Sequence, residues 1–357
     1  MATAFGIITS SANHIKIAGM QDYRPMGAFS FAGRYRVIDF PISNMSNSGI
    51  DNIQVYVREN PRSLAEHLGN EGSFNINSKK GKLQLLFSDN STANDVYNTD
   101  VAAFAENMNI ISRKTQDYNE LLDQHVASGA DVTLLYHRVN NAKESYLHCD
   151  TLDLNKQKGV LSIERNTGTA NAKNIFMDTY VMKKDLFISL IREAQKLSSI
   201  YTLSQIINSE VNDLDVRGVA HRGYFATVTD FKSYYEANLD LIDVDNANSL
   251  FHENWPIYTV TSDAAPTKYY EQADVKNSLV SNGCSIKGIV ENCVLGRGVT
   301  IEDGAVVKNS VILAYSRIGK DVHVENQVVD KWAQIVHAKE IIGTPEKPGY
   351  IKRDDIL

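Results

Sequence analysis

The feature that most constrains the fold is a six-residue repeat of apolar residues in the last part of the chain. One row comprises Ile289, Leu295, Ile301, Val307 and Leu313. A second comprises Val294, Val306, Ile312, Ile318 and Val324, interrupted only by Thr300. This period is typical of a hexapeptide β-helix, in which each short strand forms one side of a triangular coil. A β-sandwich would show period-two alternation instead. Because one coil cannot bury its own apolar face, several must stack, and we predict a left-handed β-helix with corners at Gly296, Gly298, Gly304 and Gly319.

The first part of the chain alternates apolar runs with helical segments. We expect buried strands at Ala4–Thr9, Ile53–Val57 and Val132–Tyr136, and helices at Ile42–Ile50 and Tyr118–Ser128 that close at Gly49 and Gly129. This alternation predicts an α/β fold with a mostly parallel sheet. A chain of 357 residues exceeds one usual core. We therefore predict an α/β domain over residues 1–245, followed by a linker and the β-helix domain over residues 246–357.

Composition narrows the class of protein. Hydrophobic residues make up 43% and charged residues 22%, as in ordinary soluble proteins. The net charge of −7 gives no bulk attraction for nucleic acid or anionic membrane. Cys149, Cys284 and Cys293 form no CxxC pair, which argues against a disulfide framework and a structural zinc site. With neither a signal-peptide pattern nor a membrane-length apolar stretch, we expect a cytoplasmic protein.

Four stretches of the chain resemble ADP-glucose pyrophosphorylases (glucose-1-phosphate adenylyltransferases), in the order found in that family. They read GRYRVIDFPISNMSNSG from Gly33, YFATVTDFKSYYEANLDL from Tyr224, WPIYTVTSDAAPTKY from Trp255 and SLVSNGC from Ser278. The resemblance covers nearly the whole chain and is greatest to the GlgD-type, non-catalytic subunit of bacteria that make a two-component enzyme. It implies a nucleotidyltransferase Rossmann-like domain, a left-handed hexapeptide β-helix and a role in glycogen biosynthesis.

The reaction of that family transfers the adenylyl group of ATP to glucose-1-phosphate and releases pyrophosphate. It needs a cradle for the triphosphate, cationic groups for the developing charge and a divalent metal held by carboxylates. The resemblance places the phosphate loop of relatives, GGxGxRL, on the stretch Ser11, Ala12, Asn13, His14, Ile15, Lys16 and Ile17. All three glycines are absent from this stretch, and Lys16 replaces the arginine.

Other catalytic positions also depart from the family pattern. Met26 stands where relatives carry the phosphate-directed lysine of RAKPA, and a thioether cannot neutralise charge. Ala102 aligns with the aspartate of GTADA, and Thr227 aligns with the metal-binding aspartate of WxDVGT. The strand and loop that carry the other metal carboxylate are missing from the sequence around Lys114–Asp117. That short connection is either a true deletion or the place of residues left out of the numbering.

These departures predict a chain that has no catalytic residues and binds no cofactor, whereas its catalytic partner requires Mg²⁺. The resemblance implies a hetero-oligomer with an active ADP-glucose pyrophosphorylase subunit, a heterotetramer in the family's pattern. We expect neither a nucleic-acid nor a membrane partner. It also implies a phosphorylated-metabolite effector, for which Arg34, Arg36, Lys352 and Arg353 are the candidate binding residues. The alternative for these four is an ordinary solvated basic side chain.

Two other functions stay open at this point. The chain is either an active nucleotidyltransferase with a rebuilt site or a sensor that binds ATP or a sugar phosphate without catalysis. The lost glycines and the lost carboxylate argue against the first alternative. The Ser/Asn-rich stretch that begins at Ser11 leaves room for the second.

Overall fold

A computed structural model describes residues 4–9, 17, 19–57, 60–69, 71–77, 79, 81–87, 99–111, 120–197 and 201–357. The chain forms two compact units, each assembled from segments that are separate in sequence. Unit 1 comprises Met1–Lys16, Asn44–Pro61 and Ile76–Phe225, and unit 2 comprises Ile17–Ser43, Arg62–Asn75 and Ala226–Leu357. The predicted domains, 1–245 and 246–357, stay a prediction, since the compact units interleave along the chain. Among the described helices, none has the length and apolarity needed to cross a bilayer.

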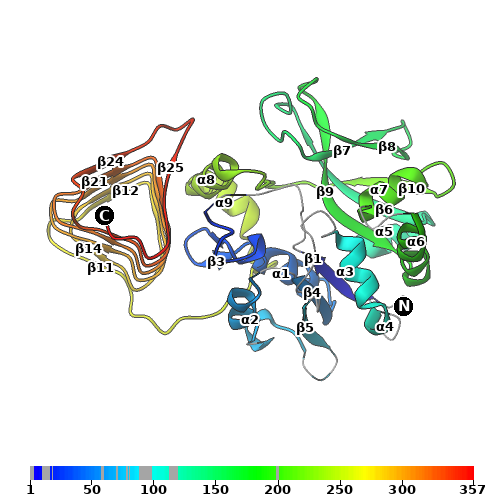
Figure 1. The fold of residues 1–357 in the computed structure, drawn as a ribbon, viewed down its shortest axis with the longest axis horizontal. Coiled ribbons are helices and arrows are strands. Elements are labelled where there is room, and N and C mark those ends of the chain that lie inside the picture. Colours follow the sequence, from blue (N-terminus) through cyan, green and yellow to red (C-terminus); the bar gives the residue numbers. More distant parts are fainter. Residues whose placement is uncertain are drawn as a thin grey trace. The chain divides into compact units, whose positions relative to one another are not determined.

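Unit 1 is built on two sheets (Figure 1). Its strands are β1 (Gly6–Thr9), β4 (Asn52–Val57), β5 (Lys82–Phe87), β6 (Val132–Val139), β7 (Asp150–Leu154), β8 (Val160–Arg165), β9 (Lys173–Met182) and β10 (Val216–Ala220). The smaller sheet is parallel in the order β1-β4-β5, and the larger has the order β10-β6-β9-β7-β8. Parallel pairing within the smaller sheet and between β10 and β6 confirms the predicted α/β character. The antiparallel pairing of β9 with β6 and β7 was not predicted.

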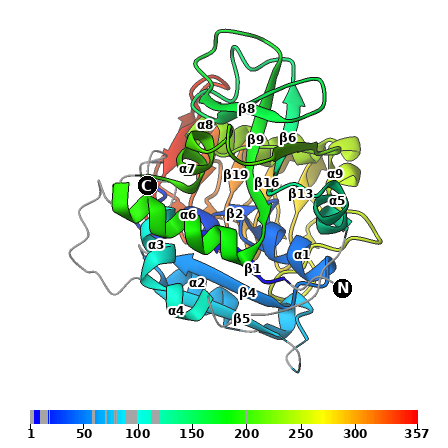
Figure 2. The same ribbon diagram turned by 90° about the vertical axis from the view of Figure 1, so that its right-hand side faces the viewer.

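Helices of unit 1 pack their apolar sides into its core. They are α3 (Asp100–Glu106), α4 (Met108–Ile111), α5 (Glu120–Ser128), α6 (Lys184–Leu197) and α7 (Leu203–Ser209). In α6 the buried residues are Phe187, Leu190, Ile191 and Ala194, the three-to-four-residue spacing of one helix face. Figure 2 shows this helix beside α3. As predicted, α5 ends before Gly129, whose φ of 69° stops the helix.

Helix α1 (Asp39–Asn47) lies three residues earlier at each end than the predicted Ile42–Ile50. It begins early because the Asp39 carboxylate accepts the backbone N–H of Arg36 at 2.8 Å and so organises the first turn. It ends early because Gly49, at a φ of 72°, leaves the helical conformation. The predicted helix is therefore present, but its bounds are shifted.

The end of the chain forms the predicted β-helix, whose coils Figure 1 views nearly end-on. Three parallel sheets make its sides. Sheet 1 contains β11 (Lys268–Tyr269), β14 (Ser285–Ile286), β17 (Thr300–Ile301), β20 (Arg317–Ile318) and β23 (Gln334–Ile335). Sheet 2 contains β12 (Asp274–Lys276), β15 (Ile289–Glu291), β18 (Val306–Lys308), β21 (His323–Glu325) and β24 (Glu340–Ile342). Sheet 3 contains β13 (Leu279–Val280), β16 (Val294–Leu295), β19 (Val311–Ile312), β22 (Gln327–Val329) and β25 (Gly349–Ile351).

Most coils are one residue shorter than a strict six-residue repeat requires. In sheet 2, Ile289 pairs with Val306 and Val306 with His323, so residues 17 apart stack (306 − 289 and 323 − 306). Three sides of six would give 18, so the predicted apolar rows drift from one face to the other. Ile289 is 40% exposed, whereas its neighbour Val290 is fully buried. The inward row of this sheet is Val290, Val307, Val324 and Ile341.

Asparagine occupies the corner between sheets 2 and 3 in four successive coils. Asn277, Asn292, Asn309 and Asn326 all have φ between 43° and 52°, and asparagine tolerates this left-handed region better than most residues. Their side chains also form a ladder. Asn277 Nδ2 donates to Asn292 Oδ1 at 2.6 Å, and Asn292 Nδ2 donates to Asn309 Oδ1 at 3.2 Å. The predicted glycine corners hold at Gly298 and Gly304, which have φ of 67° and 70°, but Gly296 and Gly319 have no positive φ.

The rest of unit 2 contains α2 (Arg62–Leu68), α8 (Phe231–Leu239), α9 (Val244–Leu250), the hairpin of β2 (Ser30–Phe31) and β3 (Tyr35–Arg36), and 3₁₀ turns at Met26–Ala28, Glu71–Phe74 and Asp240–Ile242. Of these, α8 contacts strand β19 of sheet 3. The Tyr235 hydroxyl of α8 donates to the Asn309 carbonyl at 2.5 Å. From the preceding position of the helix, the Tyr234 hydroxyl donates to the Ser30 carbonyl at 2.6 Å. Helix α8 thus joins the β-helix to the segment before α1.

We expect Asn309→Ala to destabilise unit 2 by about 1.5–3 kcal/mol. Alanine loses the ladder hydrogen bond and must adopt an unfavourable left-handed backbone. Asn309→Gly loses only the ladder bond and is the matched control, so it should be the less destabilised variant. Both tryptophans of the chain, Trp255 and Trp332, lie in unit 2, so denaturant unfolding followed by tryptophan fluorescence measures this unit. Equal destabilisation by alanine and glycine would show that the backbone conformation is unimportant.

Candidate functional site

A buried ion pair anchors the N-terminal segment of unit 2 to the β-helix. The Arg24 guanidinium pairs with the Asp330 carboxylate, and the two residues are 2% and 0% exposed. The Tyr350 hydroxyl donates to Asp330 Oδ2 at 2.6 Å, and the Ser316 hydroxyl donates to the Asp330 carbonyl at 2.7 Å. Asp330 therefore has partners from three parts of unit 2. Among the described residues, Arg24 Nε has no hydrogen-bond partner.

A second buried carboxylate, Asp39, holds the start of α1. Its Oδ1 lies 2.5 Å from His67 Nε2. Burial lowers the pKa of His67 below its usual value, and the contact with Asp39 opposes that shift. The Arg36 guanidinium does not reach Asp39 in this way and instead donates to the Ser63 carbonyl and hydroxyl, at 2.5 and 3.1 Å. Arg36 thus links the β2–β3 hairpin to α2.

Like charges gather around Lys331. Burial is the main cause that lowers the pKa of the Lys331 ammonium to about 7, and the neighbouring Arg36, Arg24 and Arg353 lower it further. Asp330 opposes the shift, but its carboxylate is already engaged by Arg24 and Tyr350. A lysine near neutrality among arginines favours the arrival of an anion, which would restore its charged form. We call Arg24, Arg36, Lys331 and Arg353 the cation cluster.

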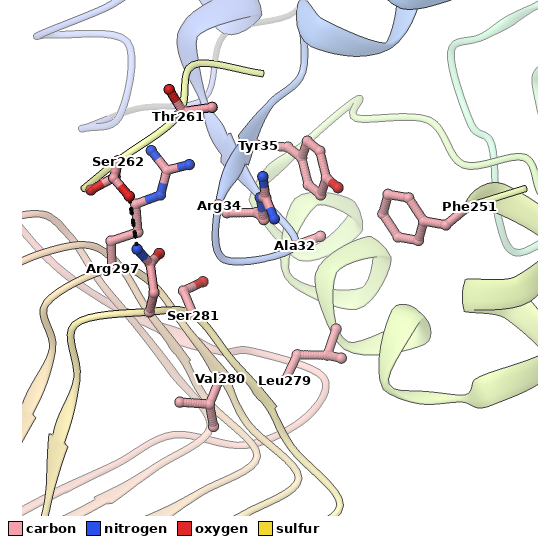
Figure 3. A pocket seen from close by; sticks show the side chains of 11 residues that line it. Ala32, Arg34, Tyr35, Phe251, Thr261, Ser262, Leu279, Val280, Ser281 and Arg297 are labelled. Carbon is pink, nitrogen blue, oxygen red and sulfur yellow. Dashed lines mark hydrogen bonds between the residues drawn. The ribbon is translucent and has the colours of Figure 1, made fainter. Parts of the chain in front are cut away.

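A pocket of about 410 Å³ lies beside this cluster in unit 2 (Figure 3). Arg34 and Tyr35 of the hairpin face Arg297 and Ser281 of the β-helix across it. Burial and then the charge of Arg34 lower the pKa of Arg297. Arg297 in turn contributes to lowering the pKa of Arg36. The remaining lining residues are Ala32, Phe251, Thr261, Ser262, Leu279, Val280 and Asn282. Two arginines and several hydroxyl or amide groups thus converge on one cavity.

The tip of the hairpin must come very close to the β-helix to form this pocket. Gly33 has a φ of 74°, and a Cβ added to it would lie 2.5 Å from Ser281 Oγ and 2.8 Å from the Leu295 carbonyl oxygen. Glycine is therefore required by both the backbone conformation and the contact. The ring of Tyr35 stacks on Phe251 at 5.2 Å, and the Arg34 guanidinium lies 5.2 Å from the Tyr35 ring centre. These contacts place Arg34 at the pocket.

The four predicted effector-binding residues have different surroundings. Arg34 lines the pocket, and Arg36 and Arg353 lie near Lys331. Arg353 also pairs with Asp354 at 3.1 Å, and Lys352 is exposed, with its backbone N–H donating to Asp355 at 3.3 Å. Sequence reasoning missed Arg24, Arg297 and Lys331. The alignment of Arg297 with Lys331 could have been predicted by aligning successive coils of the β-helix. The two residues are separated by 34 residues, which is two coils of 17.

The degenerate catalytic positions are only partly described. Ser11, Ala12, His14 and Lys16, as well as Lys114–Asp117, lie outside the described residues. Met26 is half-buried at the start of a 3₁₀ turn in unit 2. Ala102 lies in the first turn of α3 in unit 1, where its N–H donates to Thr99 Oγ1 at 3.2 Å. Thr227 is half-buried in the irregular segment before α8. Across the described part of the chain, no three histidine, cysteine or acidic side chains are arranged to hold a metal ion.

We expect Asp330→Asn to destabilise unit 2 by about 3–5 kcal/mol, because it leaves the buried Arg24 charge uncompensated. Tryptophan fluorescence during denaturant unfolding measures the change. Lys276→Met is the control, because it breaks an exposed pair with Asp274 and should cost less than about 1 kcal/mol. If both variants lose similar stability, Arg24–Asp330 is not the anchor of this segment.

Comparison with known proteins identifies the family. Residues 23–244 match the nucleotidyl transferase family, and residues 264–348 match the GlmU-like C-terminal hexapeptide family. The chain is 28% identical to the glycogen biosynthesis protein GlgD of Bacillus subtilis (strain 168), over 98% of this chain and 95% of that protein. It is 27% identical to the glucose-1-phosphate adenylyltransferase of Bacillus mycoides (strain KBAB4), over 90% of this chain and 89% of that protein. The enzyme of the same name from Fervidobacterium nodosum is 28% identical, over 92% of this chain and 83% of that enzyme. These matches confirm the predicted resemblance, and the chain belongs to the nucleotidyl transferase family.

Proposed function

We propose that the chain is a non-catalytic, regulatory subunit of a glucose-1-phosphate adenylyltransferase that acts in glycogen biosynthesis. Similarity to GlgD and to glucose-1-phosphate adenylyltransferases over at least nine-tenths of this chain supports the pathway. The observation that carries the regulatory part is the cation cluster around Lys331, next to the pocket between Arg34 and Arg297. Such a concentration of positive charge in a chain of net charge −7 favours an anionic ligand.

The residues at the family's catalytic positions support the absence of adenylyl transfer. Mg²⁺ is held by oxygen ligands, chiefly carboxylates. Thr227 provides a hydroxyl and Ala102 a methyl group at positions where the resemblance places aspartates. Met26 provides no charge for a developing oxyanion. These residues do not fit a magnesium ion, and we derive no catalytic step for this chain.

A phosphorylated metabolite is the class of effector that the cation cluster and the pocket favour. Guanidinium groups bind phosphate oxygens in pairs, and an ammonium adds a point charge. Arg34, Arg36 and Arg297 belong to unit 2 together with Lys331 and Arg353, so one ligand would bind groups from both the hairpin and the β-helix. A ligand that binds one arrangement of these segments better than another would shift the equilibrium between them. In a hetero-oligomer this shift would reach a catalytic subunit through the interface.

Adenylyl transfer assays test the proposal directly. ADP-glucose formation from ATP, glucose-1-phosphate and Mg²⁺ is measured for this chain alone, for a catalytic glucose-1-phosphate adenylyltransferase subunit alone and for an equimolar mixture. We expect this chain alone to be inactive and the mixture to differ from the catalytic subunit in rate or in its response to phosphorylated metabolites. Turnover by this chain alone at the catalytic subunit's rate would establish an enzyme with a rebuilt site.

Anion binding should weaken as pH rises through 7. Lys331 carries its charge below its pKa of about 7 and loses it above that value. Sulfate remains a dianion throughout this range and serves as the probe. We expect its affinity to fall about tenfold from pH 6 to pH 8.5, on the order of 1.4 kcal/mol, in isothermal titration calorimetry.

Two variants of Lys331 complete that experiment. Lys331→Met should bind sulfate weakly at both pH values, because the titrating charge is gone. Lys331→Arg should keep binding at pH 8.5, since a guanidinium stays charged. A steep pH dependence in Lys331→Met would assign the titration to another group, of which His67 is the nearest buried candidate.

A further inference from the structure

The corner between sheets 3 and 1 carries two aromatic residues in an unusual backbone conformation. Successive coils place Gly283, Gly298, Tyr315, Trp332 and Asp354 at this corner, with φ of 81°, 67°, 63°, 66° and 62°. The hydrogen bonds between coils confirm the alignment. Tyr315 N–H donates to the Arg297 carbonyl at 2.9 Å, and Trp332 N–H donates to the Ala314 carbonyl at 3.3 Å. Tyr315 and Trp332 therefore occupy the corner position that Gly283 and Gly298 occupy in the two preceding coils.

Large side chains are unfavourable at such corners, so their presence needs a reason. The corner between sheets 2 and 3 uses asparagine, and the corner between sheets 1 and 2 uses Gly304 and Asp321, residue types that the left-handed region accepts. Tyr315 and Trp332 are each 48% exposed. The β-helix core does not require their rings, and strained residues on a surface point to a function there.

The two rings present their edges to solvent. Their centroids are 4.4 Å apart and their planes differ by 17°, so they stack face to face. The other side of the Tyr315 ring lies against Gly298, where an added Cβ would be 2.6 Å from Tyr315 Cδ1. These contacts cover both faces of the Tyr315 ring and one face of Trp332. They leave the ring edges, which carry the positive part of the aromatic quadrupole. Such edges attract negatively charged or carbonyl oxygens.

A column of basic residues runs directly beside the rings. The positions that precede the corner in successive coils are Arg297, Ala314, Lys331 and Arg353, as the bonds from Tyr315, Trp332 and Asp354 to the preceding coil show. Asp354 offsets part of this charge through its pair with Arg353. Asp330, next to Lys331, is engaged by Arg24 and Tyr350. The strip therefore keeps an excess of positive charge along the same edge as the two rings.

We propose that Tyr315 and Trp332, with Arg297, Lys331 and Arg353 beside them, dock an extended acidic segment of a partner polypeptide. We call these five residues the aromatic corner. Stacked coils are about 4.8 Å apart, so the strip from Arg297 to Arg353 is about 14 Å long. An extended chain covers that length with about four or five residues. Tryptophan, tyrosine and arginine are also the residues that dominate binding energy in protein interfaces.

The catalytic adenylyltransferase subunit is the expected source of the acidic segment, and this identification alone rests on the proposed function. A carbohydrate chain is the competing ligand, because sugar rings also bind aromatic side chains. It would need an open ring face, and since both faces of Tyr315 lie against Trp332 and Gly298, the pair offers it at most one face of Trp332. The charge beside the rings likewise favours an acidic ligand over a neutral one.

The test uses the full chain and the double variant Tyr315→Asn/Trp332→Asn. Asparagine suits the left-handed corner, as Asn292 and Asn309 show in the neighbouring column, so we expect a thermal midpoint at least equal to that of the unchanged chain. Fluorescence anisotropy with a labelled hexaglutamate peptide should show at least tenfold weaker binding by the variant. Raising NaCl from 50 to 300 mM should weaken binding by the unchanged chain. Val244→Asn removes a 68% exposed apolar residue from α9 and should bind like the unchanged chain.

Association with a catalytic adenylyltransferase subunit, followed by biolayer interferometry, separates the two proposals. If the unchanged chain binds both the peptide and the catalytic subunit and the double variant binds neither, the docking inference and the proposed function are both supported. If the peptide responds to ring removal but the subunit does not associate at all, the docking inference stands and the proposed function fails. Equal binding of the peptide by both chains, equal binding of the subunit by both chains, or ring-dependent retardation by glycogen in affinity electrophoresis would each overturn the docking inference.

Discussion

The hydrogen-bonded stacking of coils, most of them with paired residues 17 apart, is the constraint on which the rest of unit 2 depends. It aligns Val290, Val307 and Val324 in the core and repeats asparagine at one corner. The same stacking brings residues without any sequence motif in common into one column. Arg297, Lys331 and Arg353 are neighbours only because the coils repeat. The candidate site is thus a consequence of the register of the β-helix rather than of a local sequence pattern.

The Arg24–Asp330 pair connects this register to the remainder of the unit. One carboxylate accepts the Arg24 guanidinium and the Tyr350 hydroxyl, so little of its charge is left for Lys331. Breaking a buried pair on one side leaves an uncompensated charge, which explains why a single residue can secure the whole segment. The hairpin that follows Arg24 then reaches the β-helix through Gly33 and positions Arg34 at the pocket.

More of the fold than of the candidate site could be predicted from the sequence. The apolar repeat predicted the β-helix, but a period of six placed Ile289 inside although it is 40% exposed, because most coils contain 17 residues rather than 18. The parallel strands were predicted from apolar runs, whereas the antiparallel β7–β9 region has no comparable signal. Arg34 and Arg36 were found through the family resemblance. Arg24, Arg297 and Lys331 were not found, because their proximity arises from tertiary packing. Arg24 and Lys331, for example, are 307 residues apart in the sequence.

The electrostatics of Lys331 favour a bound anion. Its folded pKa of about 7 lies below the ordinary lysine value of 10.5, so the folded chain holds this proton less tightly than the unfolded chain. The charged Lys331 therefore lowers the free energy of unfolding most below pH 7, and this destabilisation disappears as pH rises toward 10.5. The neighbouring arginines cannot reduce the charge repulsion by losing a proton, because a guanidinium stays protonated. A cluster with that penalty is relieved by a bound anion, which stabilises the folded state in proportion to its occupancy. Uncharged residues, Met26, Ala102 and Thr227, stand at the positions that the family resemblance aligns with charged catalytic residues. The contrast between these uncharged residues and the mutually repelling cations around Lys331 is the physical argument for the proposed ligand-dependent regulation without adenylyl transfer.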